Sequence, residues 1–117
     1  MARICVIEEE EGVRILLEQF LARLGHEVMA FASGTEALEG LRHETQDIGV
    51  FFVDVGMTPM SGVEFFSRLS SSAQKRVIFM TGGSEDPAVT VTHRPVIHKP
   101  FNLELVKTLA EMVPRRF

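Results

Sequence analysis

The feature that most constrains the fold is one short apolar run, residues 48 to 54, that ends in a single acid. Apolar residues fill this run almost completely until Asp54 closes it. A parallel strand covered by helices on both faces has this pattern, because both of its alternating sides meet apolar neighbours. We therefore expect a central strand with Asp54 at the carboxyl edge of its sheet.

Four similar apolar runs recur along the chain and alternate with amphipathic stretches. They cover residues 3 to 7, 26 to 31, 77 to 81 and 95 to 98. Strands that alternate with helical patterns are typical of parallel α/β folds. We predict a doubly wound α/β domain with a five-stranded parallel sheet.

The stretches between these runs carry helix signals. Apolar residues recur at helical spacing from Val13 until Gly25, a residue that commonly ends helices. Ser33 and Ser61 each precede a Glu by three residues, which is the capping-box pattern at a helix start. Asn102 is expected to cap the last helix. Its apolar positions are Leu103, Val106, Leu109, Ala110 and Val113.

Length and charge exclude several classes of protein. At 117 residues we expect one domain over residues 1 to 117, without a separate DNA-binding or enzymatic output domain. Twelve Lys and Arg against sixteen Asp and Glu give a net charge of −4, and no basic strip predicts direct nucleic-acid binding. No apolar run has the length of a membrane span, so we expect a soluble, cytoplasmic protein. Cys5 lies in an apolar run and is interpreted as a core residue.

Polar side chains follow the predicted strands at the point where each strand ends. Glu8 and Glu9 follow the first, Asp54 ends the third, Thr81 ends the fourth and Lys99 follows the fifth. Ligands of open parallel sheets bind at the edge where these ends meet. Carboxylates gathered there repel one another unless a cation compensates, which predicts a hard divalent metal such as Mg²⁺ with oxygen ligands.

In this order, these residues resemble the receiver domains of two-component response regulators over nearly the whole chain. The resemblance is carried by the acid pair after the first strand, by the run that follows Asp54, by Met80-Thr81-Gly82, and by Lys99-Pro100-Phe101. It implies a flavodoxin-like sheet of strand order 2-1-3-4-5. We also expect the Lys99–Pro100 bond to be cis, a feature of tight turns.

The resemblance also implies an activity. Asp54 would accept a phosphoryl group from a phosphohistidine on a histidine kinase or a histidine phosphotransfer protein, and the phosphorylated chain would act on an unknown downstream protein. Mg²⁺, or Mn²⁺, would be held by Glu8, Glu9, Asp54 and the carbonyl of Gly56. The remaining phosphoryl oxygens would be bound by Lys99, the Thr81 hydroxyl and the Gly82 N–H.

Three features depart from the family pattern. Aspartate is usual in the acid pair, whereas Glu8 and Glu9 are one methylene longer, so we expect a weakened or altered Mg²⁺ site. The loop proline usually lies one residue nearer the acceptor than Pro59, and Thr58 takes its place, which predicts another loop path. Val96 stands where many receivers carry an aromatic switch residue, and valine cannot operate that switch.

The connection between the fourth and fifth strands is short. Thirteen residues separate Thr81 from Pro95, whereas a parallel crossover needs roughly a dozen or more. The β-branched residues 89 to 92 disfavour a helix there. We predict that the helix usual at this place is absent or reduced to about one turn, and that residues 82 to 95 signal through order and disorder.

Two other functions remain as alternatives. A degenerate receiver would bind partners without phosphorylation, which the glutamate pair and the altered loop favour. Aspartyl-phosphate hydrolases of the haloacid dehalogenase class also place an aspartate at a strand end, but their general acid lies two residues later. Gly56 occupies that position here and cannot transfer a proton, so we do not expect an enzyme.

Overall fold

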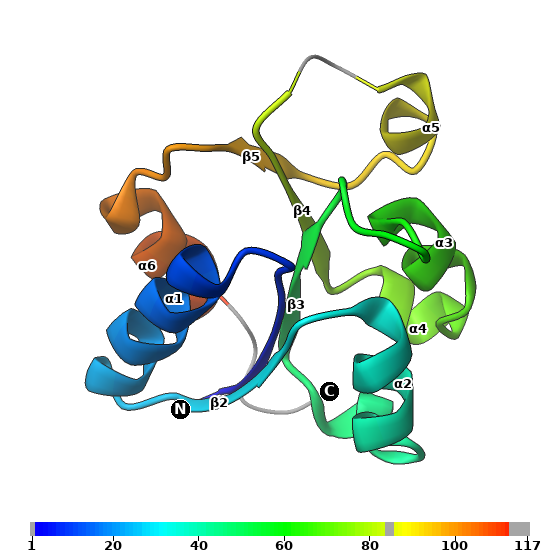
Figure 1. Cartoon of the computed structure of the whole chain (residues 1–117). Helices are drawn as coiled ribbons and strands as arrows, with labels where there is room; N and C mark the ends of the chain where they lie inside the picture. Colours follow the sequence, from blue (N-terminus) through cyan, green and yellow to red (C-terminus); the bar gives the residue numbers. More distant parts are fainter. Residues whose placement is uncertain (1, 84–85, 113–117) are drawn as a thin grey trace.

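The fold is a five-stranded parallel sheet with helices on both faces (Figure 1). A computed structural model of the chain describes residues 2–83 and 86–112. All strand pairs are parallel, and the order is β2-β1-β3-β4-β5, as predicted. The strands are β1 (Arg3–Ile7), β2 (Glu27–Phe31), β3 (Val50–Asp54), β4 (Val77–Thr81) and β5 (Val96–His98).

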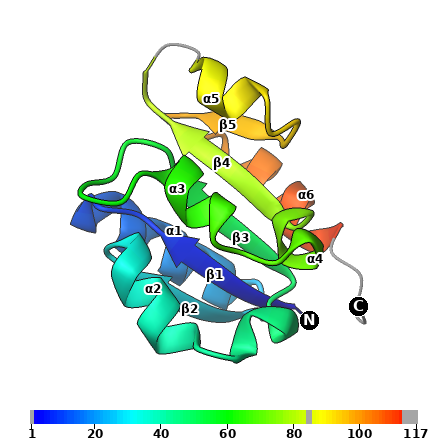
Figure 2. The same cartoon turned by 90° about the vertical axis from the view of Figure 1, so that its right-hand side faces the viewer.

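The helices divide between the two faces of the sheet. Figure 1 shows α1 (Glu11–Arg23) and α6 (Leu103–Glu111) together on one face. Figure 2 looks onto the opposite face, which is covered by α2 (Gly34–Leu41), α3 (Gly62–Ser67) and α4 (Ser71–Gln74). A 3-10 turn, η1 (Glu44–Asp47), leads into β3, and α5 (Pro87–Thr90) lies between β4 and β5.

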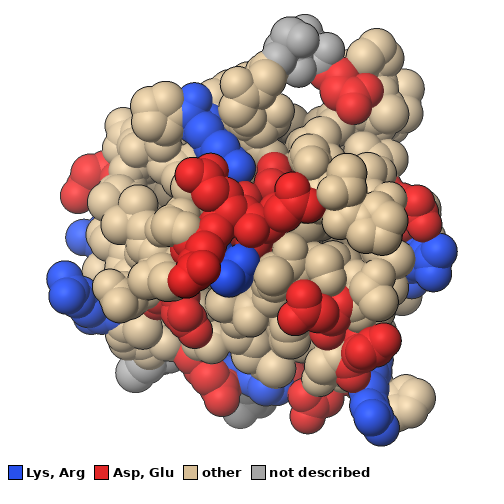
Figure 3. Space-filling model, in the orientation of Figure 1, with Lys and Arg blue, Asp and Glu red and all other residues tan. Residues whose placement is uncertain are grey.

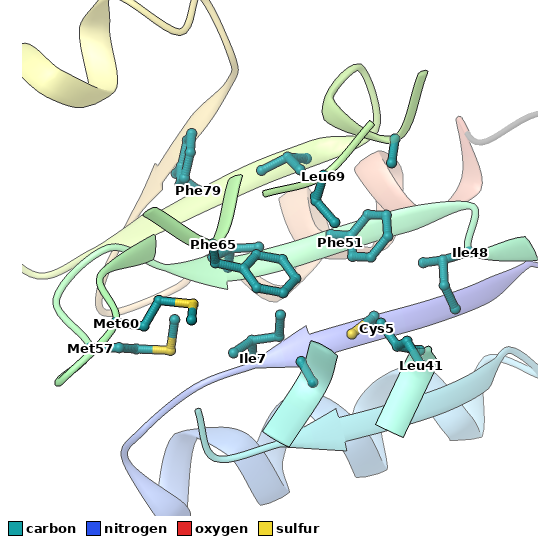
Figure 4. Close-up of a cluster of buried hydrophobic side chains, with 14 of the residues drawn as sticks. Cys5, Ile7, Leu41, Ile48, Phe51, Met57, Met60, Phe65, Leu69 and Phe79 are labelled. Atoms are coloured by element: carbon teal, nitrogen blue, oxygen red, sulfur yellow. The ribbon is translucent and has the colours of Figure 1, made fainter. Parts of the chain in front are cut away.

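Each face of the sheet has its own apolar core. Figure 4 shows the core beneath α2 to α5, to which Cys5 and Phe51 belong. The core beneath α1 and α6 contains Phe52. Every residue of β3 is buried, which explains why its sequence is apolar without alternation. Burial raises the pKa of the Cys5 thiol, in line with its interpretation as a core residue.

The predicted helix signals are confirmed where the structure describes them. The Ser33 and Ser61 side chains accept hydrogen bonds from the backbone N–H three residues later, at 3.1 Å in both cases. Asn102 caps α6 through two backbone N–H groups, at 2.9 and 3.3 Å. Gly25 follows α1 with φ 95°, a conformation that costs glycine little. Val113, predicted as a core position of the last helix, lies outside the described residues.

Several boundaries differ from the predicted ones. Strand β3 begins at Val50 and β2 at Glu27, each later than the apolar run that predicts it. Helix α3 ends at Ser67, and a further short helix, α4, begins after Ser70, whose side chain caps it. Helix α4 and the 3-10 turn η1 were not predicted from the sequence, because neither is long enough to show a period. The Lys99–Pro100 bond is cis, as predicted, and Thr58–Pro59 is cis as well.

The connection between β4 and β5 contains a helix of only four residues, α5, which is about one turn. The side chain of Asp86 caps it, Pro87 occupies its first turn, and Val89 is its buried residue. The prediction of a fourth helix reduced to about one turn is thus confirmed. Residues 84 and 85 of this connection lie outside the described part of the chain.

Across residues 2–83 and 86–112, no helix combines the length and the apolar character needed to cross a bilayer.

Candidate functional site

The register of the strands brings the predicted site residues to one edge of the sheet. Ile7 pairs with Val53, so Glu8 follows β1 at the level at which Asp54 ends β3. Thr81 pairs with His98, so Lys99 follows β5 next to the end of β4. In Figure 3 acidic side chains gather at the centre of this face, with basic side chains beside them.

Lys99 connects two of the acids at this edge. Its Nζ lies 2.6 Å from Glu8 Oε1 and 3.6 Å from Asp54 Oδ1. Glu8 is fully buried and Asp54 is 7 % exposed, whereas the Lys99 side chain is 21 % exposed. The second Glu8 oxygen accepts the Glu10 N–H at 3.0 Å. Glu8 is therefore the nearer partner of the ammonium group, and Asp54 is the more accessible carboxylate.

The electrostatics of this group follow from burial and from the closeness of the two acids. Burial raises the pKa of Glu8, and the neighbouring Asp54 carboxyl raises it further, while Lys99 and the Glu10 N–H act in the opposite direction. Burial alone would lower the pKa of Lys99, but the Glu8 and Asp54 carboxylates outweigh it and raise that pKa above its ordinary value. Lys99 is thus positively charged beside Asp54 at neutral pH.

The loop after β3 fixes the position of Asp54. The Gly56 N–H donates to Asp54 Oδ1 at 3.2 Å, and the Gly62 N–H donates to the Val55 carbonyl at 3.1 Å. A Cβ on Gly62 would lie 2.4 Å from the Asp54 carbonyl oxygen, so only glycine allows α3 to begin this close to the strand end. This close contact between the start of α3 and the end of β3 holds the loop next to Asp54.

Glu9 points to a different partner from Glu8. Its Oε2 accepts the Thr58 backbone N–H at 3.0 Å and the Thr58 hydroxyl at 3.1 Å. Both side chains lie at the surface. The loop after β1 is held from the other side by Arg14 of α1, whose guanidinium donates to the carbonyls of Glu8 at 3.0 Å and Glu9 at 3.4 Å.

Thr81 and Gly82 lie at the end of β4, beside Lys99. The Thr81 hydroxyl accepts the Gly83 N–H at 3.1 Å. A Cβ on Gly82 would meet Lys99 Cδ at 3.7 Å, an ordinary contact, so crowding does not demand glycine there. Thr81 also lines a cavity of about 250 Å³ together with Val55, Val96 and His98.

The predicted metal ligands are only partly brought together. Glu8 and Asp54 lie close enough for one carboxyl to raise the pKa of the other, and their oxygens suit a hard divalent cation. Glu9 is held by Thr58 instead. Within residues 2–83 and 86–112, no three His, Cys, Asp or Glu side chains form a group that could hold a metal ion.

Two residues of this site were not predicted from the sequence. Thr58 was noted only for the loop path, although a residue other than proline at its position supplies the N–H that binds Glu9. Arg14 had no recognisable signal, because one arginine on a helix face is usually exposed to solvent.

The fold and the site together define the class of this protein: a doubly wound α/β domain in which two acids and a lysine meet at the carboxyl edge of the sheet. The chain belongs to the response regulator receiver domain family, whose model matches residues 4–111. The resemblance stated from the sequence is thereby confirmed, and membership of this family supports a phosphoacceptor role in two-component signalling.

Relatives and solved structures agree with this family. The chain is 33 % identical to the transcriptional regulatory protein AfsQ1 of Streptomyces coelicolor over 91 residues, which cover 78 % of this chain and 40 % of AfsQ1. It is 28 % identical to the response regulator receiver protein CpdR of Brucella abortus, over 97 % of this chain and 98 % of CpdR. The chemotaxis protein CheY4 of Vibrio cholerae matches with a TM-score of 0.81 and 26 % identity, over 97 % of this chain and 99 % of CheY4.

The chain covers very different shares of the lengths of its relatives. The chain spans 40 % of AfsQ1 and 34 % of the Bacillus subtilis regulator YrkP, so it corresponds to one part of these longer proteins. It spans 87 % of the sporulation initiation phosphotransferase F of Bacillus subtilis, at 26 % identity.

Proposed function

We propose that this chain accepts a phosphoryl group on Asp54 from a phosphohistidine of a histidine kinase or a histidine phosphotransfer protein. The observation that carries the proposal is the half-buried Lys99, whose ammonium lies 3.6 Å from Asp54 Oδ1 while Glu8 holds it at 2.6 Å. A fixed cation beside a carboxylate suits phosphoryl transfer, in which alignment and charge neutralisation supply most of the catalysis.

In the transfer step, an Asp54 carboxylate oxygen attacks the phosphorus atom. The phosphorus–nitrogen bond breaks, its electron pair returns to the imidazole of the donor, and an acyl phosphate forms on Asp54. Lys99 then pairs with one phosphoryl oxygen. The Thr81 hydroxyl and the Gly82 N–H, at the end of the neighbouring strand β4, bind another.

Glu8, Asp54 and the Gly56 carbonyl are the groups that would hold Mg²⁺ or Mn²⁺. Such a cation supplies positive charge against the phosphoryl oxygens. Glu8 and Lys99 orient one another, and the Gly56 N–H holds one Asp54 oxygen at 3.2 Å.

We infer that the phosphorylated chain signals through contacts with another protein, in the cytoplasm, without direct binding to nucleic acid or to a membrane. We treat residues 1 to 117 as one receiver domain that is not itself a metabolic enzyme.

The test is labelling with acetyl phosphate in the presence of Mg²⁺, read by intact-mass spectrometry. One phosphoryl group should be added to the wild type and none to Asp54→Asn. Asp47→Asn is the matched control, because Asp47 lies before the amino end of β3 and should not affect labelling. Label that survives Asp54→Asn, or that maps elsewhere, would contradict the proposal.

Two other outcomes decide between the alternatives. A folded wild type that takes no label from acetyl phosphate or from any phosphorylated kinase would identify a degenerate receiver, which the engagement of Glu9 by Thr58 favours. Sustained turnover of phosphate esters would identify a hydrolase.

A further inference from the structure

The edge of the sheet at which the strands begin, opposite the Asp54 edge, has a cavity of about 290 Å³ lined by three basic side chains. Lys75 and Arg76 immediately precede β4, and Arg94 lies two residues before β5. Figure 2 shows α4 and the carboxyl end of α6 at this end of the sheet. No acid of residues 2–83 or 86–112 lines the cavity, although the chain has sixteen Asp and Glu against twelve Lys and Arg. Positive charge is therefore concentrated here on an acidic protein.

The backbone holds two of these cations in place. Arg94 Nε donates to the Val77 carbonyl at 2.9 Å, and Arg76 Nη1 donates to the Gln46 carbonyl at 3.2 Å. Burial lowers the pKa of both guanidinium groups. Among the described residues, no acid forms an ion pair with Lys75 or Arg94. An anion in the cavity would thus meet positioned donors, and it would offset the cost of gathering and partly burying like charges.

The remaining wall of the cavity is mainly apolar. It includes Val50 at the start of β3, and Leu109 and Met112 at the end of α6. The Met112 side chain is 71 % exposed, so it is accessible to a partner. The carboxyl end of α6 is equivalent to roughly half a negative charge, which three cations exceed. A cavity of this size lies just below the range of about 300 to 1,000 Å³ typical of small-molecule sites, so it suits side chains better than a nucleotide.

We propose that this cavity binds an acidic peptide segment of a partner protein, with its carboxylates on Lys75 and Arg94 and an apolar side chain against Met112. Charge selects this occupant, because a cleft lined by cations attracts anions and the guanidinium fork matches a carboxylate. The last residues of the chain itself do not suit the cavity, since Arg115 and Arg116 would add further positive charge. The cavity lies at the opposite edge from Asp54, so the inference goes beyond the proposed function.

The experiment is titration of a fluorescent five-residue peptide, four glutamates around a central leucine, into the full chain, followed by fluorescence anisotropy. The wild type should bind it with a dissociation constant below about 1 mM. Lys75→Glu should weaken binding by about tenfold, because one cation is lost and one acid is added at an exposed position. Arg23→Glu is the matched control. It makes the same charge change at an exposed residue that does not line the cavity, and it should weaken binding by less than about twofold.

Amide NMR shifts should locate the peptide at Gly49, Lys75 and Arg94, and circular dichroism should show that both variants are folded. The proposal is overturned if the wild type does not bind, if Lys75→Glu and Arg23→Glu weaken binding equally, or if the peptide with glutamine in place of glutamate binds as tightly. Inorganic phosphate that binds as tightly as the peptide would show an anion site without peptide recognition and would also overturn it.

Two further results would assign the cavity to another occupant and so overturn the proposal. One is binding that appears only after residues 113 to 117 are removed, which would make the end of the chain the occupant. The other is a wild-type dimer in analytical ultracentrifugation that Lys75→Glu abolishes, which would make a second copy the occupant. Labelling of Asp54 by acetyl phosphate should be the same in wild type and Lys75→Glu, so the proposed function is tested separately.

Discussion

At the scale of single residues, the reach of each charged side chain decides which groups meet. The longer Glu8 side chain brings its carboxylate to 2.6 Å from Lys99, so the ammonium lies nearer to Glu8 than to Asp54, at 3.6 Å. The ammonium group of Lys99 compensates the negative charge of the buried Glu8 carboxylate. Lys99 accordingly has a structural task as well as its proposed role toward the phosphoryl group.

Replacing Lys99 should therefore reduce stability. Lys99→Met leaves the buried Glu8 carboxylate without its cation and should lower the free energy of unfolding by about 2 to 4 kcal/mol, somewhat less than for a fully buried pair. Urea denaturation at neutral pH, with a chelator present, measures this. The exposed Lys75→Met should stay within about 0.5 kcal/mol of the wild type, and Glu8→Gln combined with Lys99→Met should recover part of the loss. Equal stability of the two Met variants would contradict the structural role.

Shortening both acids should improve the metal site. In the double variant Glu8→Asp, Glu9→Asp, the carboxylates reach Lys99 and Thr58 less well, and Mg²⁺ binding should tighten by about tenfold. The affinity for Ca²⁺, which accepts less regular geometry, should increase less. Calorimetric titration of both metals tests this. Weaker Mg²⁺ binding in the double variant would show that side-chain length does not limit this site.

At the scale of elements, the loops after β3 and β4 control the surroundings of Asp54. Helix α3 begins against the end of β3, and Gly62 makes that approach possible. The connection after β4 carries only the four-residue α5, which contacts the core through Val89. The loop after β3 is thus held closely against the strand end, and α5 packs on the core through one buried side chain.

A methyl group at position 62 should disturb the loop that positions Asp54. Gly62→Ala would place a Cβ 2.4 Å from the Asp54 carbonyl oxygen, so the backbone must shift, with a loss of about 1 to 3 kcal/mol in stability and slower labelling of Asp54. Gly12→Ala in α1 is the matched control. No atom lies within 4 Å of its added Cβ, and it should stabilise the helix by up to about 1 kcal/mol. Unfolding curves and labelling rates that respond equally to both changes would contradict this view.

Helix α5 should be weakly stable until Asp54 is phosphorylated. One turn with a single buried side chain opens easily, so its amides should exchange quickly in the free protein. Thr81 lines a cavity together with residues of α5 and ends β4 beside Asp54, so its binding of the phosphoryl group should slow this exchange. Amide hydrogen exchange of both forms measures it, with α2 as the unchanged reference. Strong protection of α5 that is the same in both forms would refute the order and disorder mechanism.

At the scale of the whole molecule, two separate cores share one sheet. Strand β3 contributes Phe51 to one core and Phe52 to the other, and both side chains are fully buried. The sheet therefore depends on the helices of both faces, and the sheet edge that carries Asp54 depends on both cores.

Substitutions of buried residues on either face of β3 should lower the free energy of unfolding by similar amounts. Phe51→Ala and Phe52→Ala should each lower the free energy of unfolding by about 3 to 5 kcal/mol, a large part of the roughly 5 to 15 kcal/mol typical of a domain. Leu105→Ala on α6 is the control with small effect, since Leu105 is 44 % exposed. Urea denaturation should show single transitions. A large loss of stability for only one of the two Phe variants would mean that the two cores are not equally necessary.

Most of the fold could be predicted because its signals are local. The apolar run that ends at Asp54 indicated a strand buried on both faces, and the Ser33, Ser61 and Asn102 caps were each found where the pattern placed them. The shortness of α5 followed from counting residues between Thr81 and Pro95. Boundaries such as the start of β3 at Val50, and the short α4, depend on packing that no local pattern contains.

By itself, then, the sequence determined the class of fold and the edge of the sheet at which Glu8, Asp54, Thr81 and Lys99 would meet, because strand ends follow from the order of apolar runs. Only the tertiary structure decided which groups pair there. Lys99 pairs more closely with Glu8 than with Asp54, and Glu9 turns to Thr58, 49 positions away. Such choices depend on differences of about an ångström between loops that are distant in the chain, and these are determined by how both cores pack beneath them.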